Sequence, residues 1–357
     1  MFFLDVAFVI LAAIVVFVWL TTFHPAPMEP AQIRHRGIAK RLKKGQEFKV
    51  MSWNIQYLAG KTYVFYYDIL NGSGPDLRPA RTQIDLTFEE VMRVIREENP
   101  DVLQLQEVNV GAKNTDHDDQ LTRIFEALPE TYTHVASVWY WKSPFIPHPK
   151  IMGAVGMKLA TFSKYEISKA TRYQLPVPHP DPITYLYTFR RAVMQCVFPV
   201  ESDEPVVVLN THLDAFAQGS DTMTQQVAYL VRRLNTLNEN STHWLLSGDF
   251  NLLPSKKAYD ALPPALQAYY SPQIELSALS SRFAMIPSVE ECDGVNRERW
   301  MTFFSNNPMV RAPDRTLDYL FYASSFSVVE HRVRQADTLR ISDHLPIIAT
   351  FVVPVKR

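Results

Sequence analysis

Hydrophobic residues divide this chain into one continuous apolar block and a long body in which two kinds of periodicity alternate. The block covers residues 2–22, where Asp5 is the one charged side chain. About 20 apolar residues are needed to cross a bilayer as a helix. A cleaved signal peptide would need a basic start and small residues at a cleavage site. Because neither feature is present, we predict an uncleaved transmembrane anchor over residues 1–23.

The region after the block, residues 24–47, combines proline with positive charge. Pro25, Pro27 and Pro30 predict a linker. Its basic residues are Arg34, Arg36, Lys40, Arg41, Lys43 and Lys44. The positive-inside rule then places the rest of the chain in the cytoplasm, although the same residues could instead lie on anionic headgroups. We therefore expect a single-pass membrane protein with a cytoplasmic body.

From residue 48 onward, strand patterns alternate with helix patterns. Leu103 and Leu105 alternate with glutamines, as in a strand, whereas Leu121, Ile124 and Phe125 have the spacing of one helix face. Similar patterns predict further strands over residues 48–54, 153–162, 187–200, 205–212, 242–247, 317–322, 327–334 and 346–353, and a helix over 222–237. This alternation predicts an α/β fold in which sheet layers are covered by helices.

Local signals refine this picture. Thr87 and Glu90 match a capping box, which predicts a helix start. Residues 140–150 and 173–181 are rich in proline and aromatic side chains, so we predict ordered loops near a functional site. Because no boundary divides residues 48–357, we expect one domain there.

Composition limits the class of function. The chain is 47% hydrophobic and 20% charged, as in ordinary globular proteins. Its net charge is −1, so no overall positive field draws it to nucleic acid, which argues against a nuclease without excluding a local basic groove. Cys196 and Cys292 are far apart, which predicts two free thiols rather than a zinc site or a disulfide.

Polar side chains follow nearly every predicted strand. They are Asn54, Glu107, Asn210, His212, Asp249, Asn251, Asp318, Asp343 and His344. A single residue of this kind usually forms a turn, but strands of one layer end at a common edge, where these groups could converge. Such a set suits Mg²⁺, with Mn²⁺ as the alternative, because hard cations take oxygen ligands. It points to hydrolysis of a phosphate ester.

The carboxylates and amides have candidate roles around such a cation. Glu107 is the strongest candidate ligand, with Asp343 and Asn54 beside it. Asp249 and Asn251 lie two apart on extended backbone, so their side chains share one face. The aspartate can orient or deprotonate a water, and the asparagine can hold a phosphate oxygen without adding negative charge.

The basic side chains complete the candidate site. His212 and His344 provide one base toward water and one group that stabilises charge on the phosphoryl oxygens. Asp318 could hold one imidazole in its productive tautomer and keep it protonated. Arg190 and Arg191 are either further phosphate contacts or an exposed pair of cations.

Six short motifs, in order along the chain, resemble those of the endonuclease/exonuclease/phosphatase superfamily, which includes DNase I, apurinic endonucleases, inositol polyphosphate 5-phosphatases and neutral sphingomyelinases. The motifs are Trp53-Asn54, Gln106-Glu107, Asn210-Thr211-His212-Leu213, Gly248-Asp249-Phe250-Asn251, Leu317-Asp318-Tyr319 and Ser342-Asp343-His344-Leu345-Pro346. The resemblance covers residues 48–353 and implies a four-layer sandwich of two packed mixed β-sheets flanked by helices. For the site it implies Mg²⁺ at Glu107 with help from Asn54 and Asp343, water and phosphate at Asp249 and Asn251, and imidazoles beside the phosphate at His212 and His344, the second paired with Asp318.

Apurinic endonucleases lack a histidine in the motif that contains His212, whereas DNase I-like, lipid-directed and inositol-directed members carry one. The chain therefore resembles the latter members rather than apurinic endonucleases. We expect a membrane-anchored, Mg²⁺-dependent phosphoester hydrolase, a phosphodiesterase or phosphatase acting as a monomer on a lipid or another small phosphorylated molecule. A DNase I-like endonuclease or exonuclease is the alternative, with nucleic acid as the less favoured partner. An inactive binding or scaffold protein is disfavoured because every position of the site is intact.

Three other features have weaker claims to function. The run Asp116-His117-Asp118-Asp119 resembles a metal cluster, but its place between a strand and a helix favours a solvated loop with a helix cap. Lys158 is a minor candidate for the cleft. The aromatic stretches 63–67 and 139–141 are expected to pack in the core, with contacts to bases or lipids as the alternative.

Overall fold

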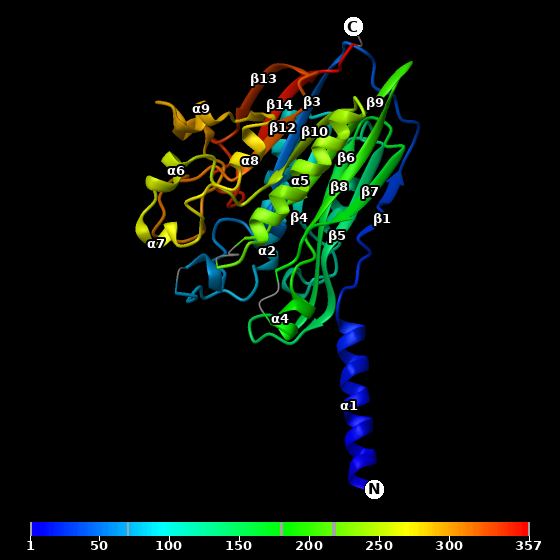
Figure 1. Ribbon diagram of the computed structural model, residues 1–357, viewed down its shortest axis with the longest axis vertical. Helices are drawn as coiled ribbons and strands as arrows, with labels where there is room; N and C mark the ends of the chain where they lie inside the picture. Colours follow the sequence, from blue (N-terminus) through cyan, green and yellow to red (C-terminus); the bar gives the residue numbers. More distant parts are fainter. Residues whose placement is uncertain (1, 70, 179–180, 216–218, 356–357) are drawn as a thin grey trace.

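The computed structural model describes residues 2–69, 71–178, 181–215 and 219–355, which form two packed seven-stranded sheets with helices outside (Figure 1). The first sheet has the order β1 (Met28–Pro30), β7 (Lys169–Gln174), β8 (Ala192–Val200), β9 (Asp203–His212), β10 (His243–Asp249), β12 (Asp318–Tyr322), β11 (Ala284–Ile286). The second has the order β13 (Ser327–Val333), β14 (Ile347–Val352), β3 (Glu47–Asn54), β4 (Val102–Asn109), β6 (Gly153–Ser163), β5 (His134–Ile146), β2 (Gln32–His35). Residue 1 of the expected anchor, residues 179–180 of the expected loop and residues 356–357 of the expected domain lie outside the described residues.

Both sheets are mixed. β3 pairs with β4 in parallel, as β9 does with β10, and β14 and β12 join these pairs antiparallel. Parallel neighbours need a crossover connection, which α2 (Arg81–Glu98) and α5 (Thr222–Glu239) provide. With α2 and α3 (Gln120–Ala127) on the second sheet and α5 on the first, the predicted four-layer sandwich is confirmed. The short helices are α4 (Pro182–Tyr187), α6 (Lys256–Asp260), α7 (Pro264–Gln267), α8 (Ser277–Ser280), α9 (Val289–Asp293) and the 3₁₀ turns η1 (Gln56–Leu58), η2 (Tyr66–Asp68), η3 (Lys113–Thr115) and η4 (Arg297–Trp300).

The central strand β3 shows how the sequence builds these layers. Phe48 and Val50 point into the core between the sheets, whereas Met51 and Trp53 pack against α2. Successive side chains of a strand point to opposite faces, and here both faces are covered. A strand buried on both sides therefore reads as a nearly continuous apolar run.

Polar side chains also join the two sheets near the functional edge. Asn210 of β9 accepts a hydrogen bond from Gln106 Nε2 at 2.8 Å and donates to the carbonyls of Leu105 at 3.2 Å and Ala160 at 3.0 Å. The alternating glutamines of β4 thus face the neighbouring sheet rather than solvent. Asn210, one of the polar strand ends, serves to hold the sheets in register.

We expect Asn210→Leu to lower the free energy of unfolding by about 2–4 kcal/mol, because buried groups that lose their partners cost about 1–3 kcal/mol each. Urea denaturation of the full chain in detergent measures the loss. Asn235→Leu, at an exposed position of α5, is the control variant. A loss below about 0.5 kcal/mol, the usual range for surface substitutions, would contradict this role.

Several predicted boundaries are wrong. β5 extends to Ile146 through most of the loop predicted over 140–150, and β7 includes the start of the loop predicted over 173–181. The strand predicted over 187–200 is the end of α4 followed by β8. Thr87 is buried inside α2 rather than capping it, because the helix begins at Arg81, shortly after Pro79.

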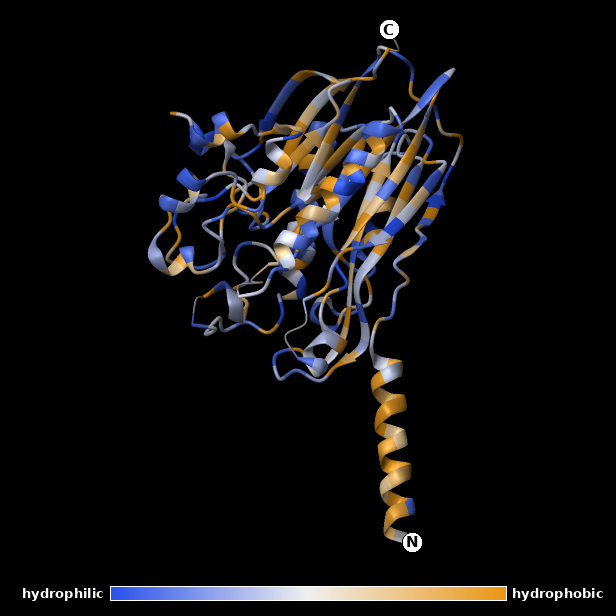
Figure 2. Ribbon diagram, viewed as in Figure 1, coloured by the Kyte–Doolittle hydropathy of each residue, from blue (hydrophilic) through white to orange (hydrophobic). Residues whose placement is uncertain are grey.

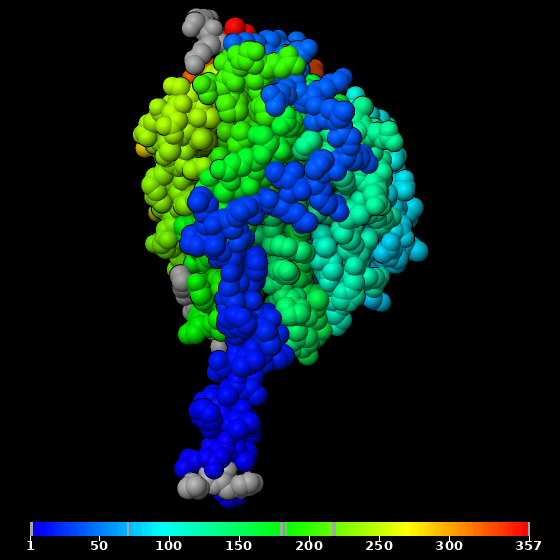
Figure 3. Space-filling model, turned by 90° about the vertical axis from the view of Figure 1, so that its right-hand side faces the viewer, coloured from blue at the N-terminus to red at the C-terminus, as the bar shows by residue number. Residues whose placement is uncertain are grey.

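The segment predicted as a linker lies along the body instead (Figure 3). Its β1 pairs with β7 of the first sheet and its β2 pairs with β5 of the second. Its basic residues contact the body: for example, Arg36 donates to the Leu128 carbonyl at 2.8 Å, and Arg41 pairs with Glu166 at 2.9 Å. Residues 28–35 therefore close one edge of each sheet.

Helix α1 (Phe2–Thr21) projects away from this body and is apolar along its length (Figure 2). Its residues Phe3–Thr21 have a mean hydropathy of 2.8. By length and composition the helix can cross a membrane, a property that it shares with signal sequences. Its end is fixed to the body, because Thr21 Oγ1 lies 3.1 Å from the Tyr187 hydroxyl.

Candidate active site

The predicted site residues all lie at one end of the two sheets. They are Asn54 at the end of β3, Glu107 in β4, His212 at the end of β9, Asp249 at the end of β10 with Asn251 just beyond, Asp318 at the start of β12, and Asp343 and His344 before β14. Parallel strands end at the same edge, and their antiparallel neighbours begin there. The topology therefore gathers residues that are up to 290 positions apart, from Asn54 to His344 (344 − 54).

Asp249 is the hub of the site. Its Oδ2 accepts a hydrogen bond from Asn54 Nδ2 at 3.0 Å and lies 3.2 Å from His212 Nε2 and 3.4 Å from His344 Nε2. Its Oδ1 accepts the backbone N–H of Asn251 at 3.0 Å. Burial raises the pKa of Asp249 to about 6, against the opposing effect of His344. A carboxylate with this pKa is suited to accept a proton near neutral pH.

His344 is held as a cation. Its Nδ1 lies 2.8 Å from Asp318 Oδ2, and the backbone N–H of Asp318 donates to Thr302 Oγ1 at 3.0 Å. Burial alone would lower the pKa of His344, but Asp318 and Asp249 outweigh it and raise that pKa well above the usual value. The predicted pairing of Asp318 with an imidazole is thus present in the structure.

His212 has the opposite electrostatic environment. Burial lowers its pKa well below the usual value, and Arg191 and His344 add to the effect. Its Nε2 lies 3.2 Å from Asn251 Nδ2, and its Nδ1 lies 3.5 Å from the Tyr140 hydroxyl. The site therefore combines one neutral and one positive imidazole on either side of Asp249.

Glu107 and Asp343 form an acidic pair next to this hub. Burial, and then the charge of Asp343, raise the pKa of Glu107 to about 7. Asn54 Nδ2 donates to Glu107 Oε1 at 3.2 Å, and Ser342 Oγ donates to Asp343 Oδ1 at 3.2 Å. Glu107 has a left-handed backbone (φ 57°), a conformation that is costly for this residue type and typical of functional sites.

This donor set fits a divalent cation. Two neighbouring carboxylates, one of which raises the pKa of the other, are a favourable site for a hard cation, which takes oxygen ligands and relieves their repulsion. In the structure Asn54 Oδ1 accepts the backbone N–H of Gln56 at 3.0 Å, so Asn54 orients Glu107 and Asp249 in this arrangement. Asp249, Asp318 and His344 also place ligand-type atoms within 4.8 Å of one another.

Sequence reasoning missed side chains that support this centre. Lys61 donates to the carbonyls of Phe304 and Ser305, and burial lowers its pKa to about 8 although Asp343 opposes the shift. Asp68 accepts the Phe65 backbone N–H at 2.6 Å, and burial followed by Asp343 raises its pKa to about 7. No motif or periodicity marked Lys61 or Asp68, because Lys61 lies outside the helices and strands and Asp68 lies in the short 3₁₀ turn η2.

The weaker candidates are also placed. Arg191 is buried, with its Nε 3.5 Å from Asp214 Oδ1, so it is no exposed surface cation. Lys158 is buried and donates to Ser137 Oγ at 3.1 Å. Asp119 caps α3 by accepting the Thr122 backbone N–H, which confirms the predicted helix cap. Both cysteines are free and buried, as predicted.

Comparison with known proteins decides the family. The model of the endonuclease/exonuclease/phosphatase family matches residues 51–344, which is most of the chain. The chain belongs to the endonuclease/exonuclease/phosphatase family. Members of this family hydrolyse phosphoester bonds, and the matched range contains every predicted site residue. No curated protein matches the sequence.

Solved structures show the same fold at low identity. An endonuclease/exonuclease/phosphatase from Beutenbergia cavernae is 22% identical with a TM-score of 0.59, covering 88% of this chain and 72% of that one. The catalytic domain of human Nocturnin with bound sulfate is 17% identical with a TM-score of 0.50, covering 90% and 97%. TDP2 from D. rerio complexed with a single-strand DNA product is 14% identical with a TM-score of 0.51, covering 85% and 98%. At these identities the likeness concerns the fold.

Proposed function

We propose that this family member is a membrane-anchored, divalent-metal-dependent phosphoester hydrolase that acts on a lipid or another small phosphorylated substrate. One observation carries the proposal: a neutral His212 and a positive His344 meet at Asp249, beside the acidic pair of Glu107 and Asp343. This arrangement offers a proton acceptor, a fixed positive charge and a cation site within one cluster. A phosphoester hydrolysis needs each of these.

In the proposed reaction the chain's own groups divide the work. Asp249 accepts a proton from the attacking water, which Asn251 and the neutral His212 help to orient. The positive His344 stabilises charge on the phosphoryl oxygens, and Asp318 keeps it protonated. Glu107 and Asp343 would hold Mg²⁺ or Mn²⁺, while Asn54 fixes the two carboxylates that it contacts. When bound, the cation polarises the phosphate and stabilises the leaving oxygen.

Metal binding should depend on pH through Glu107. The pKa of Glu107 in the metal-free protein is about 7, so below that pH its proton must leave before a cation binds. We expect the apparent affinity for Mn²⁺ to fall by up to roughly tenfold for each pH unit below 7. Titration calorimetry between pH 5.5 and 8 measures this, with Glu98→Gln, at a buried glutamate paired with Arg334 away from the site, as the control that keeps the dependence. An affinity that stays constant over this range would contradict the assignment.

For α1 we propose the role of a single-pass anchor that leaves the body on the cytoplasmic side. An exposed apolar helix of this length is stable in lipid and costly in water. Fractionation tests the anchor: the full chain should stay with membranes after a high-salt wash and leave them only with detergent. A chain that remains soluble without detergent would contradict the anchor, and protease protection in sealed vesicles tests its orientation.

A nuclease is the second candidate, favoured by the neighbour described as TDP2 with a single-strand DNA product. Nucleic-acid binding weakens steeply with salt because counterions are released, whereas a small substrate responds weakly. Measuring KM between 50 and 200 mM salt separates the two. A loss of affinity of about 10³-fold, as for a protein that contacts many phosphates, would favour the nuclease.

A further inference from the structure

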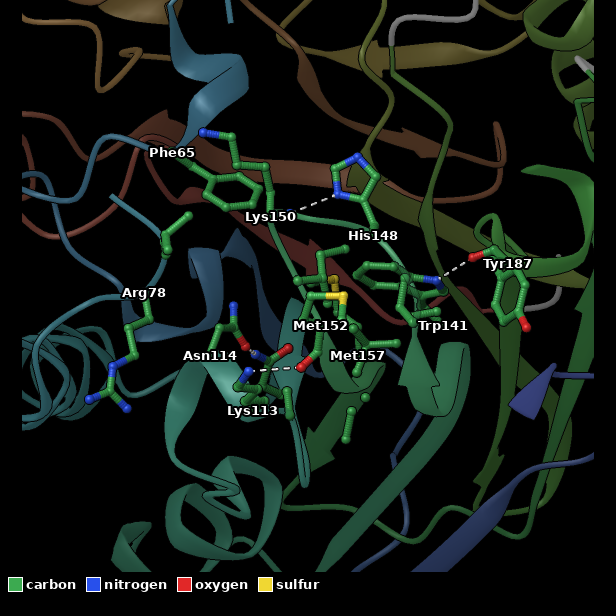
Figure 4. A pocket seen from close by; sticks show the side chains of 18 of the residues that line it. Phe65, Arg78, Lys113, Asn114, Trp141, His148, Lys150, Met152, Met157 and Tyr187 are labelled. Carbon is green, nitrogen blue, oxygen red and sulfur yellow. Dashed lines mark hydrogen bonds between the residues drawn. The ribbon is translucent and has the colours of Figure 1, made fainter. Parts of the chain in front are cut away.

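A cavity of about 600 Å³, seen from close by in Figure 4, lies beside α4, at the end of the sandwich from which α1 projects (Figure 1). Its walls come from the β5–β6 hairpin, from segments around η1, η2 and η3, from residues 77–78, and from α4 with the residues that follow it. Trp141, Ile146, Val155, Met157 and Phe189 make much of the lining apolar. Small-molecule sites typically enclose about 300–1,000 Å³ with apolar walls, so this cavity has the size and chemistry of a ligand pocket.

Aromatic contacts join the cavity to the active site. The Tyr140 ring lies 5.6 Å from the His212 ring on one side and 6.2 Å from the Phe189 ring on the other. Asn109, which also lines the cavity, follows Glu107 by two residues in β4. The cavity therefore lies beside the active site, since its wall residue Phe189 contacts Tyr140 and Tyr140 contacts His212.

The same cavity is joined to the end of α1. Tyr187 lines it, and its hydroxyl lies 3.1 Å from Thr21 Oγ1. Trp141 Nε1 donates to the Tyr187 carbonyl at 2.9 Å, and the Phe145 ring lies 6.3 Å from the Phe17 ring of α1. If α1 spans a bilayer, the cavity wall lies at its surface, where tryptophan and tyrosine are favoured.

We propose that this cavity receives the hydrocarbon chain of a membrane lipid whose phosphoester is hydrolysed at the Asp249 site. This inference rests on the proposed function and names its substrate class. An apolar interior suits an alkyl chain, and the phosphate that the chain carries would lie outside the cavity, at the Asp249 site. Stacked nucleobases are the weaker occupant, because the rings of Trp141 and Phe189 already pack on each other at 4.4 Å.

A chain-length series tests the proposal. The full chain in phosphatidylcholine nanodiscs is given 4-nitrophenyl alkyl phosphates with tails of two to sixteen carbons and Mg²⁺. We expect kcat/KM to rise with tail length, by up to about fourfold for each buried methylene, and then to level off when the cavity is full. A flat series with turnover of the shortest ester would overturn the cavity proposal and leave the proposed hydrolase standing.

Two variants separate the cavity from general partition into lipid. Ala154→Trp fills the cavity from β6, and Leu77→Asp places a charge at its exposed edge without disturbing the core. Both should flatten the chain-length series and leave the shortest ester unchanged. Ala265→Trp, on exposed α7, is the matched control and should behave as the wild type. The same dependence of kcat/KM on tail length in the wild type and in all three variants would contradict the proposal.

A binding measurement covers the case in which no ester is turned over. A dodecyl phosphate that carries a diazirine near the end of its tail is photolysed with the His344→Ala protein in nanodiscs. We expect labelling within residues 141–157, lost in Ala154→Trp. Labelling confined to α1 or absent would overturn the cavity, whatever the activity. Labelling that single-stranded DNA removes as well as excess lipid does would favour a nucleic-acid occupant and would also overturn it.

Discussion

Glu107→Gln is expected to lower kcat/KM for phosphoester hydrolysis by roughly 10³-fold or more, because it removes the carboxylate that would hold the cation. The substitution keeps the shape of the side chain and its contact with Asn54. It also removes a partly buried group whose charge is unfavourable beside Asp343. The folded structure should therefore be as stable as the wild type while Mn²⁺ binding, measured by titration calorimetry, becomes weak.

Glu98→Gln is the matched control for this variant. Glu98 is a buried glutamate that pairs with Arg334 at 2.9 Å, at the opposite end of α2 from the site. That control should lose stability and keep its activity per folded molecule. If Glu107→Gln retained more than about a tenth of the wild-type kcat/KM in saturating Mg²⁺, Glu107 would not hold the cation.

His344→Ala is the second large effect, with an expected loss in kcat of roughly 10³-fold. The pKa of His344 is raised above its usual value by Asp318 and Asp249, so its charge is present at neutral pH and is lost only when the pH rises through that raised pKa. Asp318→Asn should move the alkaline limb of the kcat profile to lower pH, because the lowered pKa releases the proton earlier. It should cost roughly 10²-fold at neutral pH.

A second histidine–carboxylate pair gives the control. His331 Nε2 lies 2.7 Å from Glu291 Oε1, far from the site in β13 and α9. His331→Ala and Glu291→Gln should leave the pH profile of kcat unchanged. An alkaline limb that stays in place in Asp318→Asn would mean that another group titrates there.

The residues of the site could be predicted more completely than the segments around them, because the site residues lie at the ends of strands. Asp249 follows a buried apolar strand and Asp318 begins one, and the pairing of β10 with β12 brings the two opposite each other. Such placement follows from pattern and topology together. The direction of a side chain cannot be predicted in this way. Asn54, expected beside the cation, turns its amide N–H toward Asp249 and Glu107.

The wrong predictions of secondary structure also have physical causes, which are contacts with segments distant in the sequence. Proline and aromatic residues in 140–150 predicted a loop. Instead β5 continues to Ile146, because its residues pair with β6 along a long antiparallel hairpin. Residues 28–35 form strands because two sheet edges were available to them. The cavity could not be foreseen, because its walls come from segments far apart in the sequence that only the folded chain brings together.

The central claim is that the Asp249 site hydrolyses a phosphoester with a divalent cation. The most direct measurement is product release by the detergent-solubilised full chain from phospholipids, sphingomyelin, inositol phosphates and nucleic acids, with Mg²⁺ or Mn²⁺ and then with EDTA. We predict turnover of at least one lipid ester with metal, loss of turnover in EDTA, recovery on adding metal back, and none in Glu107→Gln. No turnover of any of these substrates with either metal, or turnover that EDTA leaves unchanged, would contradict the claim.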